Sequence, residues 1–139
     1  MTLSIRNQIP GTVTAITFGA VMATVRARLT GGQEITAAIT AEAVKELGLA
    51  EGSAVHALAK STEIALATAP VSGLSIRNQL PGTVVEVATG GAMATVKVAI
   101  TGGELTAAIT RDAVEDLGLA AGSSVVALIK STEVSLSAG

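Results

Sequence analysis

The sequence contains no cysteine, tryptophan or tyrosine, and it has one phenylalanine, Phe18, and one histidine, His56. Without cysteine the chain can form neither a disulfide nor a thiolate metal site. One imidazole among scattered carboxylates is a poor ligand set for a transition metal. We therefore expect no direct protein–metal ligands and no cofactor.

Basic charge and aromatic residues are also scarce. Aromatic residues make up 1% of the chain, and the formal net charge is −2 with an isoelectric point near 5.3. A nucleic-acid partner favours a basic surface, and single strands also favour aromatic side chains on which bases stack. We therefore expect no nucleic-acid partner.

Long apolar runs are absent as well. A membrane-spanning helix needs a run of about 18 or more apolar residues, and polar residues or glycine interrupt every such window here. The N-terminal MTLSIRNQIPG has no basic segment followed by an apolar one, so it does not look like a secretion signal. These observations predict a cytoplasmic protein without a membrane partner.

What the sequence does contain is an internal duplication. LSIRNQIPGTV at 3–13 returns as LSIRNQLPGTV at 74–84, and 3–69 aligns with 74–139 with a single gap, opposite Gln33. Such self-similarity indicates two copies of one structural unit. The segment ATAPVSG between them has the composition of a linker. We predict a first domain at 1–69, a linker at 70–73 and a second domain at 74–139.

Each copy has the pattern of a small β-rich unit. Residues 22–29 alternate between apolar and polar, which is typical of a half-buried strand, and the following TGG indicates a hairpin. Residues 40–49 predict a short helix that Thr40 caps and Gly48 ends. This pattern predicts a mostly β fold of two tandem OB-like small β-barrels, each with one short helix.

Three further expectations concern the strands. Pro10-Gly11 predicts a turn before the first strand. AVHALAKSTEIAL at 54–66 predicts one continuous last strand. Met22 and Met93 are expected in the core.

Two aromatic-poor units of about 70 residues bury little area by themselves, so contact with other chains is expected.

Two polar runs are identical in both copies, whereas other surface charges differ. The first run contains Ser4, Arg6 and Asn7, which return as Ser75, Arg77 and Asn78. The second contains Lys60, Ser61 and Thr62, which return as Lys130, Ser131 and Thr132. Arginine, lysine, hydroxyl and amide groups all donate hydrogen bonds, and such a set suits a small dianion. A donor-only cavity favours sulfate, molybdate or tungstate over monohydrogen phosphate, whose proton needs an acceptor.

Structural interpretations of the same residues stay open. The cations can be ordinary solvated charges, because lysine and arginine are mostly exposed. Asn7 can satisfy the backbone of a turn. Thr40 and Thr110 suit helix N-caps, a position that is compatible with an anion nearby. His56 aligns with Val126, so no role common to both copies is expected for it.

Catalytic interpretations find little support. Lys60 beside Ser61 suggests a Ser–Lys dyad, but adjacent residues of a strand point to opposite faces. No motif places a base and an orienting acid near a nucleophile. The segment AKST also lacks the glycines of a phosphate-binding loop. We expect no enzyme activity.

The phrases SIRNQIPGTV, TAAITAEAVKELGLAEGS and ALAKSTEI closely resemble the molybdate-binding Mop-domain family. The resemblance spans each copy from end to end, and the tandem arrangement is similar to cytoplasmic di-Mop proteins. It implies an OB-like barrel, a homotrimer that binds molybdate or tungstate between subunits, and a role in intracellular molybdenum storage. The alternative is a molybdate-responsive sensor that acts on a partner protein in trans.

The resemblance also implies roles for particular residues. The anion donors are Ser4, Arg6, Lys60 and Ser61 in the first copy and Ser75, Arg77, Lys130 and Ser131 in the second. Thr40 and Thr110 match a hydroxyl that contacts the anion in some relatives. Ala43 and Ala113 stand where some relatives have serine, so no contact from that helix turn is implied.

Overall fold

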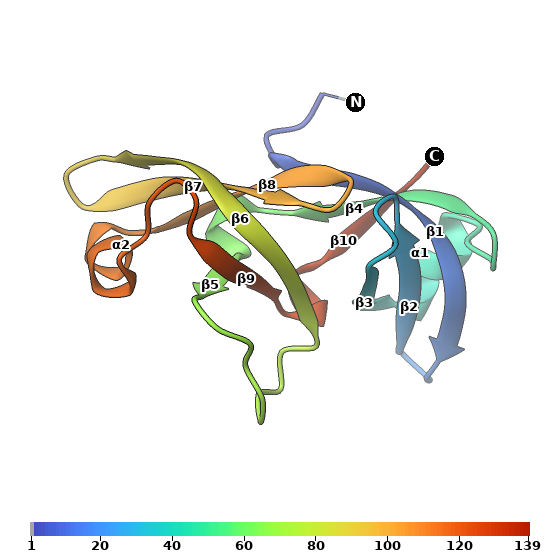
Figure 1. Ribbon diagram of the computed structural model, residues 1–139. Coiled ribbons are helices and arrows are strands. Elements are labelled where there is room, and N and C mark those ends of the chain that lie inside the picture. Colours follow the sequence, from blue (N-terminus) through green and yellow to red (C-terminus); the bar gives the residue numbers. More distant parts are fainter. Residues whose placement is uncertain (1) are drawn as a thin grey trace.

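The computed structural model describes residues 2–139 and contains two five-stranded antiparallel sheets that lie side by side, with a short helix toward each outer end (Figure 1). The first sheet has the order β10-β4-β1-β2-β3, and the second has the order β5-β9-β6-β7-β8. The first comprises β1 (Asn7–Phe18), β2 (Met22–Leu29), β3 (Glu34–Thr40), β4 (Ala54–Ala59) and β10 (Ser135–Ala138). The second comprises β5 (Ala65–Ala67), β6 (Asn78–Thr89), β7 (Met93–Ile100), β8 (Gly103–Thr110) and β9 (Ser124–Ile129). This confirms the mostly β fold with two OB-like units.

The strands form because their apolar residues alternate. In β2, Ala23, Val25, Ala27 and Leu29 are buried, and the residues between them are exposed. The strands of both repeats supply one continuous cluster of buried alanine, valine, isoleucine and leucine side chains. The two sheets therefore share a core.

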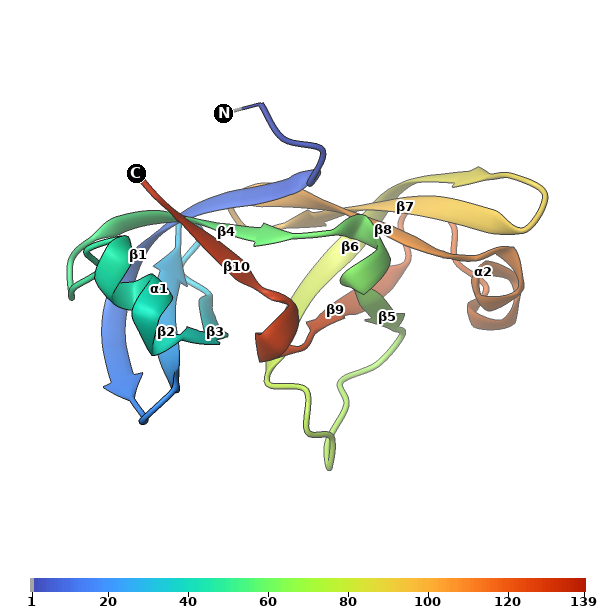
Figure 2. The same cartoon turned by 180° about the vertical axis from the view of Figure 1, so that it is seen from behind.

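Each repeat gives its last strand to the sheet of the other repeat. Strand β10 pairs with β4, and β5 pairs with β9, so the two ends are exchanged (Figure 2). The sheets and the sequence repeats consequently do not contain the same residues. The predicted boundaries at 69/70 and 73/74 follow the repeats and stay predictions.

The expectation of one continuous strand at 54–66 is wrong. Strand β4 ends at Ala59, a 3-10 turn η1 occupies Ser61–Glu63, and β5 begins at Ala65. A matching turn, η2 (Ser131–Glu133), separates β9 from β10. The turn redirects the chain to the other sheet and allows Ile64, 2% exposed, to enter the core.

The expected turn at Pro10-Gly11 is also wrong, because both residues lie inside β1. Pro10 is paired with His56 of β4, but the pairing of β1 with β2 begins one residue later, at Gly11. The N–H group that proline lacks therefore removes no hydrogen bond from the β1–β2 ladder. The Pro10 carbonyl accepts from the Thr30 N–H at 3.1 Å. At Gly11 an added Cβ would lie 2.8 Å from the Arg28 carbonyl oxygen, so the glycine permits close strand packing.

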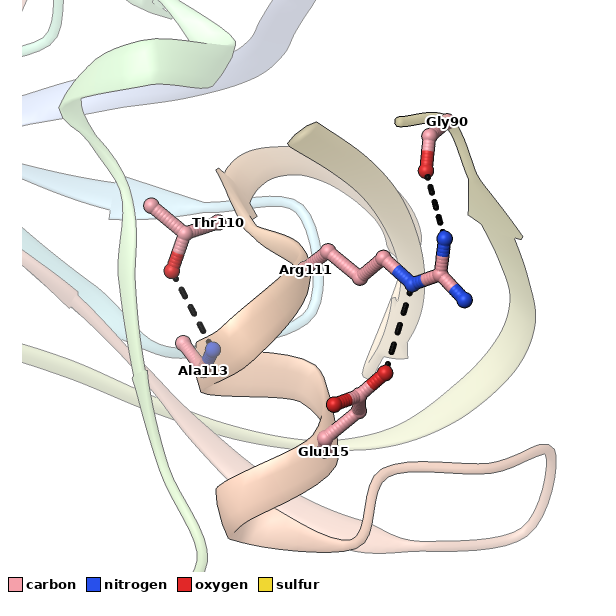
Figure 3. A network of polar contacts seen from close by, with 5 residues as sticks. All are labelled: Gly90, Thr110, Arg111, Ala113 and Glu115. Atoms are coloured by element: carbon pink, nitrogen blue, oxygen red, sulfur yellow. Dashed lines mark hydrogen bonds and ion pairs between the residues drawn. The ribbon is translucent and has the colours of Figure 1, made fainter. Parts of the chain in front are cut away.

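The predicted helices are confirmed. Helix α1 (Ala41–Glu46) begins after Thr40, whose hydroxyl accepts from the Ala43 N–H at 3.1 Å. Helix α2 (Arg111–Leu117) begins after Thr110, which makes the same bond to the Ala113 N–H (Figure 3). The chain leaves the helices through glycines with positive φ, Gly48 and Gly118.

Met22 and Met93 are not in the core: they are 45% and 48% exposed. Each methionine is the first residue of its strand, and side chains along a strand alternate between the two faces. The methionine points away from the core, and the alanine that follows it points into the core. Phe18, at the end of β1, is 53% exposed. The hydrophobic core of residues 2–139 is therefore built from aliphatic side chains.

The hairpin turns of the two repeats touch. A Cβ on Gly31 would overlap the Thr101 carbonyl oxygen, and a Cβ on Gly102 would lie 2.7 Å from the Gly31 nitrogen. Gln33 reaches across this contact: with its amide oriented to match the hydrogen-bonding groups of Thr101, its nitrogen donates to the Thr101 carbonyl at 3.2 Å and its oxygen accepts from the Thr101 N–H at 3.3 Å. Gln33 is the residue that the second repeat lacks.

Candidate anion-binding site

The pairing of β1 with β4 brings the two retained polar runs together. Asn7 is opposite Ala59 in the pairing of β1 with β4. Arg6, just before β1, and Lys60, just after β4, therefore lie at the same end of these two strands. A surface hollow of about 260 Å³ at this end is lined by Ser4, Ile5, Arg6, Lys60, Ser61 and Thr62. The structure thus gathers the predicted donors of the first repeat, apart from Asn7.

The donors are held in different ways. The Arg6 guanidinium donates to the Leu3 carbonyl from Nη2 at 2.8 Å and to the Ser4 carbonyl from Nε at 3.4 Å, which folds the side chain along its own backbone. The Ser61 hydroxyl oxygen is buried and has no hydrogen-bond partner within residues 2–139, and Ser131 is the same. Among the described residues His56 Nδ1 and Ser137 Oγ are also buried without a partner, but Ser61 and Ser131 are the two that lie in the retained polar runs, directly after Lys60 and Lys130.

Within residues 2–139 the retained cations have no carboxylate partners. Over residues 2–139 the ion pair that forms is Arg111–Glu115, at 3.3 Å on the surface of α2 (Figure 3). Arg6 and Lys60 therefore lie beside one hollow with their positive charges uncompensated. Such an arrangement attracts an anion.

The two polar runs of the second repeat also meet, but the hollow beside them has a different lining. Asn78 is opposite Ile129, so Arg77 and Lys130 lie at the same edge of the second sheet. A hollow of about 300 Å³ beside Lys130 is also lined by Ile76, by Glu133 and by Thr62 and Glu63 of the exchanged turn η1. Ser75, Arg77 and Ser131 do not line this hollow. Its two carboxylates, Glu63 and Glu133, are acceptors and are the last residues of the runs that begin at Lys60 and Lys130.

Asn7 and Asn78 are the buried polar residues of the described chain, at 3% and 2% exposure. The Asn7 amide nitrogen donates to the Ala59 and Thr106 carbonyls at 3.0 and 2.9 Å, and its oxygen accepts from the Thr106 N–H at 2.7 Å. Both amide hydrogens of Asn7 are thus engaged with backbone. The contact of the two asparagines with an anion stays a prediction.

The threonines fall into two groups. Thr40 and Thr110 cap the helices, and Thr40 lines a different hollow beside Glu42 and Lys45. The structure does not bring Thr40 to the hollow of Arg6 within this chain. Thr62 lines both the hollow of Arg6 and the one beside Lys130, and Thr132 is exposed on η2.

The comparison with known proteins agrees with the duplication. The model of the TOBE domain matches residues 3–66 and 74–136. The chain belongs to the TOBE-domain family. Each sequence repeat is one TOBE domain, and the exchanged strands β5 and β10 lie at the C-terminal ends of these matches.

Several TOBE-domain relatives carry names from molybdenum biology. Molybdenum-pterin-binding protein MopB of Rhodobacter capsulatus is 43% identical over 135 residues, covering 96% of this chain and 50% of MopB. Molybdenum transport protein ModE of Azotobacter vinelandii is 40% identical over 137 residues, covering 98% of this chain and 51% of ModE. The chain spans about half the length of both.

A solved structure matches over the full length. The cytoplasmic molybdate-binding protein ModG, in a crystal form with molybdate bound, superposes with a TM-score of 0.97 at 41% identity, covering 100% of both chains. The match includes both TOBE domains, so the pairing of the two sheets is shared with ModG. The fold is therefore that of a tandem molybdate-binding protein.

The expectation that Lys60 and Ser61 point to opposite faces of a strand is wrong. Lys60 and Ser61 line the same hollow of the first TOBE domain, because the strand ends at Ala59 and a 3-10 turn follows. The Ser61 hydroxyl nevertheless has no hydrogen-bond partner in the described chain, so Lys60 does not contact it as a base would.

Two other kinds of site receive no support from the described residues. Within 2–139 no group of three or more His, Cys, Asp or Glu side chains is placed to hold a metal ion. Neither helix in that range has the length and apolar character needed to cross a membrane.

Two features of the TOBE pair escaped the sequence reasoning. The Asn7 side chain bonds to the backbone of Thr106 and the Asn78 side chain to that of Thr36, so both asparagines join the repeats. Their burial is the feature that distinguishes them from surface amides. The contact of Gln33 with Thr101 could have been suspected from one feature of the sequence: Gln33 stands opposite the single gap in the alignment of the repeats.

Proposed function

We propose that the protein binds molybdate reversibly and without catalysis. One observation carries the proposal: the hydroxyls of Ser61 and Ser131, buried and unsatisfied, follow lysines in a chain that superposes in full on ModG. The site of the first repeat is formed by Ser4, Arg6, Lys60 and Ser61. The second is formed by Ser75, Arg77, Lys130 and Ser131.

The chemistry of these groups fits a tetrahedral dianion. Guanidinium and ammonium groups supply charge-assisted hydrogen bonds, and the serines add neutral donors. Such bonds hold an oxyanion without covalent ligation of the metal, which permits release. Tungstate has the same charge and shape as molybdate, so it binds at the same groups.

The proposed assembly is a homotrimer in which each site is completed by a neighbouring subunit. Ser4, Arg6 and Lys60 are exposed in the single chain, so one chain alone leaves an anion open to water, which weakens charge-assisted bonds. Phe18 and Val21, 53% and 71% exposed, offer apolar surface for contact between chains. The protein then serves as a cytoplasmic store of molybdenum.

Native mass spectrometry tests this function directly. The purified protein is titrated with molybdate, with tungstate, and with molybdate in excess sulfate. A trimer that gains several molybdates and ignores sulfate supports storage. A protein that takes up none of these anions contradicts the proposal, and a monomer that binds molybdate contradicts the shared site.

The match to about half of ModE supports a second candidate, a molybdate-responsive module that acts on a partner protein in trans. A pull-down with the immobilised protein, with and without molybdate, separates the two. A partner that is retained only with molybdate favours the sensor. Retention of the same proteins in both conditions favours storage.

A further inference from the structure

Asn7 occupies a central position between three segments. It follows Arg6 directly, its amide donates to the carbonyl of Ala59, and Ala59 directly precedes Lys60. The β1–β4 ladder already joins the backbones that carry the two cations, and this buried side chain adds a further bond between them. Arg6 and Lys60 repel each other when no anion is present, and this bond opposes their separation.

The same amide also reaches the other repeat. Its nitrogen and oxygen both pair with the backbone of Thr106 in β8, at 2.9 and 2.7 Å, as a neighbouring strand would. Asn78 repeats this pairing in the opposite direction: it donates to the Thr36 carbonyl of β3 and accepts from the Thr36 N–H, both at 2.8 Å. The two clamps are reciprocal.

Strand β8 continues from Thr106 to the hollow of the second repeat. Ala108 and Ile109 line that hollow beside Lys130. The contacts of Asn7 thus end on a strand that lines the hollow of Lys130, one of the four proposed anion donors of the second repeat.

We propose that Asn7 and Asn78 are positioning residues: Asn7 preorganises the cations of its own anion site, and both asparagines make their own site depend on the other repeat. The inference rests on the proposed molybdate binding and deepens it. The asparagines act through backbone contacts and do not need to touch the anion. Preorganisation raises affinity because the cost of ordering the site is met before the anion arrives.

A ligand role, a purely structural role and a positioning role differ in measurable ways. A ligand affects the affinity of its own site. A structural residue affects unfolding but leaves the affinity of the folded protein unchanged. A positioning residue that joins both repeats affects the affinity of the site in the other repeat, and by linkage an anion in one repeat stabilises the clamp in the other.

The first measurement leaves the clamp intact. In Lys130→Ala, which retains the first-repeat site, hydrogen exchange of the Thr106 N–H is followed by NMR with and without saturating molybdate. The Thr106 N–H donates to Asn7 Oδ1, so we expect its exchange to slow about fivefold or more when the first-repeat site fills. Unchanged exchange at Thr106, with molybdate bound in the same sample, overturns the inference and leaves the proposed function standing. Absence of molybdate binding overturns both.

The second measurement alters the clamp. Lys60→Ala, which retains the second-repeat site, is compared with Lys60→Ala/Asn7→Ser by calorimetric titration with molybdate, at a temperature where both are folded by circular dichroism. We expect the remaining site to lose affinity by about fivefold or more. Equal affinities contradict the inference. The matched control is Lys60→Ala/Val44→Ala, which loosens the buried face of α1, leaves the clamp residues unchanged and is expected to lower thermal stability without changing the affinity.

Discussion

Arg77 and Lys130 of the second repeat have exact counterparts in Arg6 and Lys60 of the first, so each repeat serves as a control for the other. A hydrogen bond to a charged group contributes about 1.5–3 kcal/mol, which corresponds to roughly 10-fold to 100-fold in affinity. Arg77→Ala or Lys130→Ala should weaken or remove the second-repeat sites and leave the first-repeat sites largely intact. The number of bound molybdates per assembly, measured by native mass spectrometry, checks this. An unchanged number in both variants contradicts the site assignment.

Gly31 offers a second test at the residue scale. A Cβ at this position overlaps the Thr101 carbonyl oxygen, which belongs to the backbone and has little freedom to move. Gly31→Ala should therefore destabilise the protein by about 1–3 kcal/mol, measured by urea unfolding. Gly103→Ala is the matched control, since an added Cβ there meets nothing within 4 Å and should change stability by less than about 0.5 kcal/mol. Equal stability of the two variants would contradict the turn-to-turn contact.

Single residues were predictable from the sequence where local chemistry decides their role. The N-caps Thr40 and Thr110 were predicted because a hydroxyl before an apolar helical stripe needs no tertiary information. The exposure of Met22 was not, because hydrophobicity suggested the core, whereas the parity of the strand decided the direction of the side chain. The clamp of Asn7 depends on β8, which lies far along the chain, so no local pattern could reveal it.

At the scale of elements, the N-cap of α1 separates two interpretations of Thr40. Replacement of an N-cap threonine by alanine costs about 1 kcal/mol, so Thr40→Ala should lower the melting temperature measured by circular dichroism. Thr40→Ser retains the hydroxyl and should restore most of the loss. If Thr40 also contacts the anion, as the family resemblance implies, molybdate affinity falls in Thr40→Ala as well. Unchanged affinity with lowered stability leaves Thr40 as a cap alone.

The strands show where sequence patterns stop being informative. Alternation in residues 22–29 predicted β2 correctly, because burial of one face controls the pattern. Proline and glycine usually mark turns, but Pro10 and Gly11 lie within β1. Pairing with the neighbouring strands β4 and β2 holds them in extended conformation, and this pairing cannot be seen in the local sequence. The break after Ala59 was not predictable, since a strand that changes sheets and one that continues straight bury the same apolar residues.

At the scale of the whole molecule, the exchange of β5 and β10 predicts that loss of the last strand of one repeat affects the sheet of the other repeat. Removal of residues 135–139 takes away β10, which pairs with β4 of the first repeat, and also the Gly139 N–H bond to the Ala54 carbonyl. Hydrogen exchange followed by mass spectrometry should show faster exchange in β4 and little change in β9. Without strand exchange the truncation would act on β9, so faster exchange there alone would contradict the topology.

The exchange of the last strands also means that both repeats must be present for either sheet to be complete. A polypeptide with a single repeat would have to obtain its last strand from a second molecule, and its folding would then depend on concentration. Segment 68–77, between β5 and β6, tethers the donor and the acceptor. Short flexible tethers of this kind give effective concentrations of about a millimolar, far above the usual abundance of a cellular protein. Duplication has thus converted an encounter between two molecules into an intramolecular step, and a protease cut within 68–77 would make the pairing of the halves sensitive to dilution again.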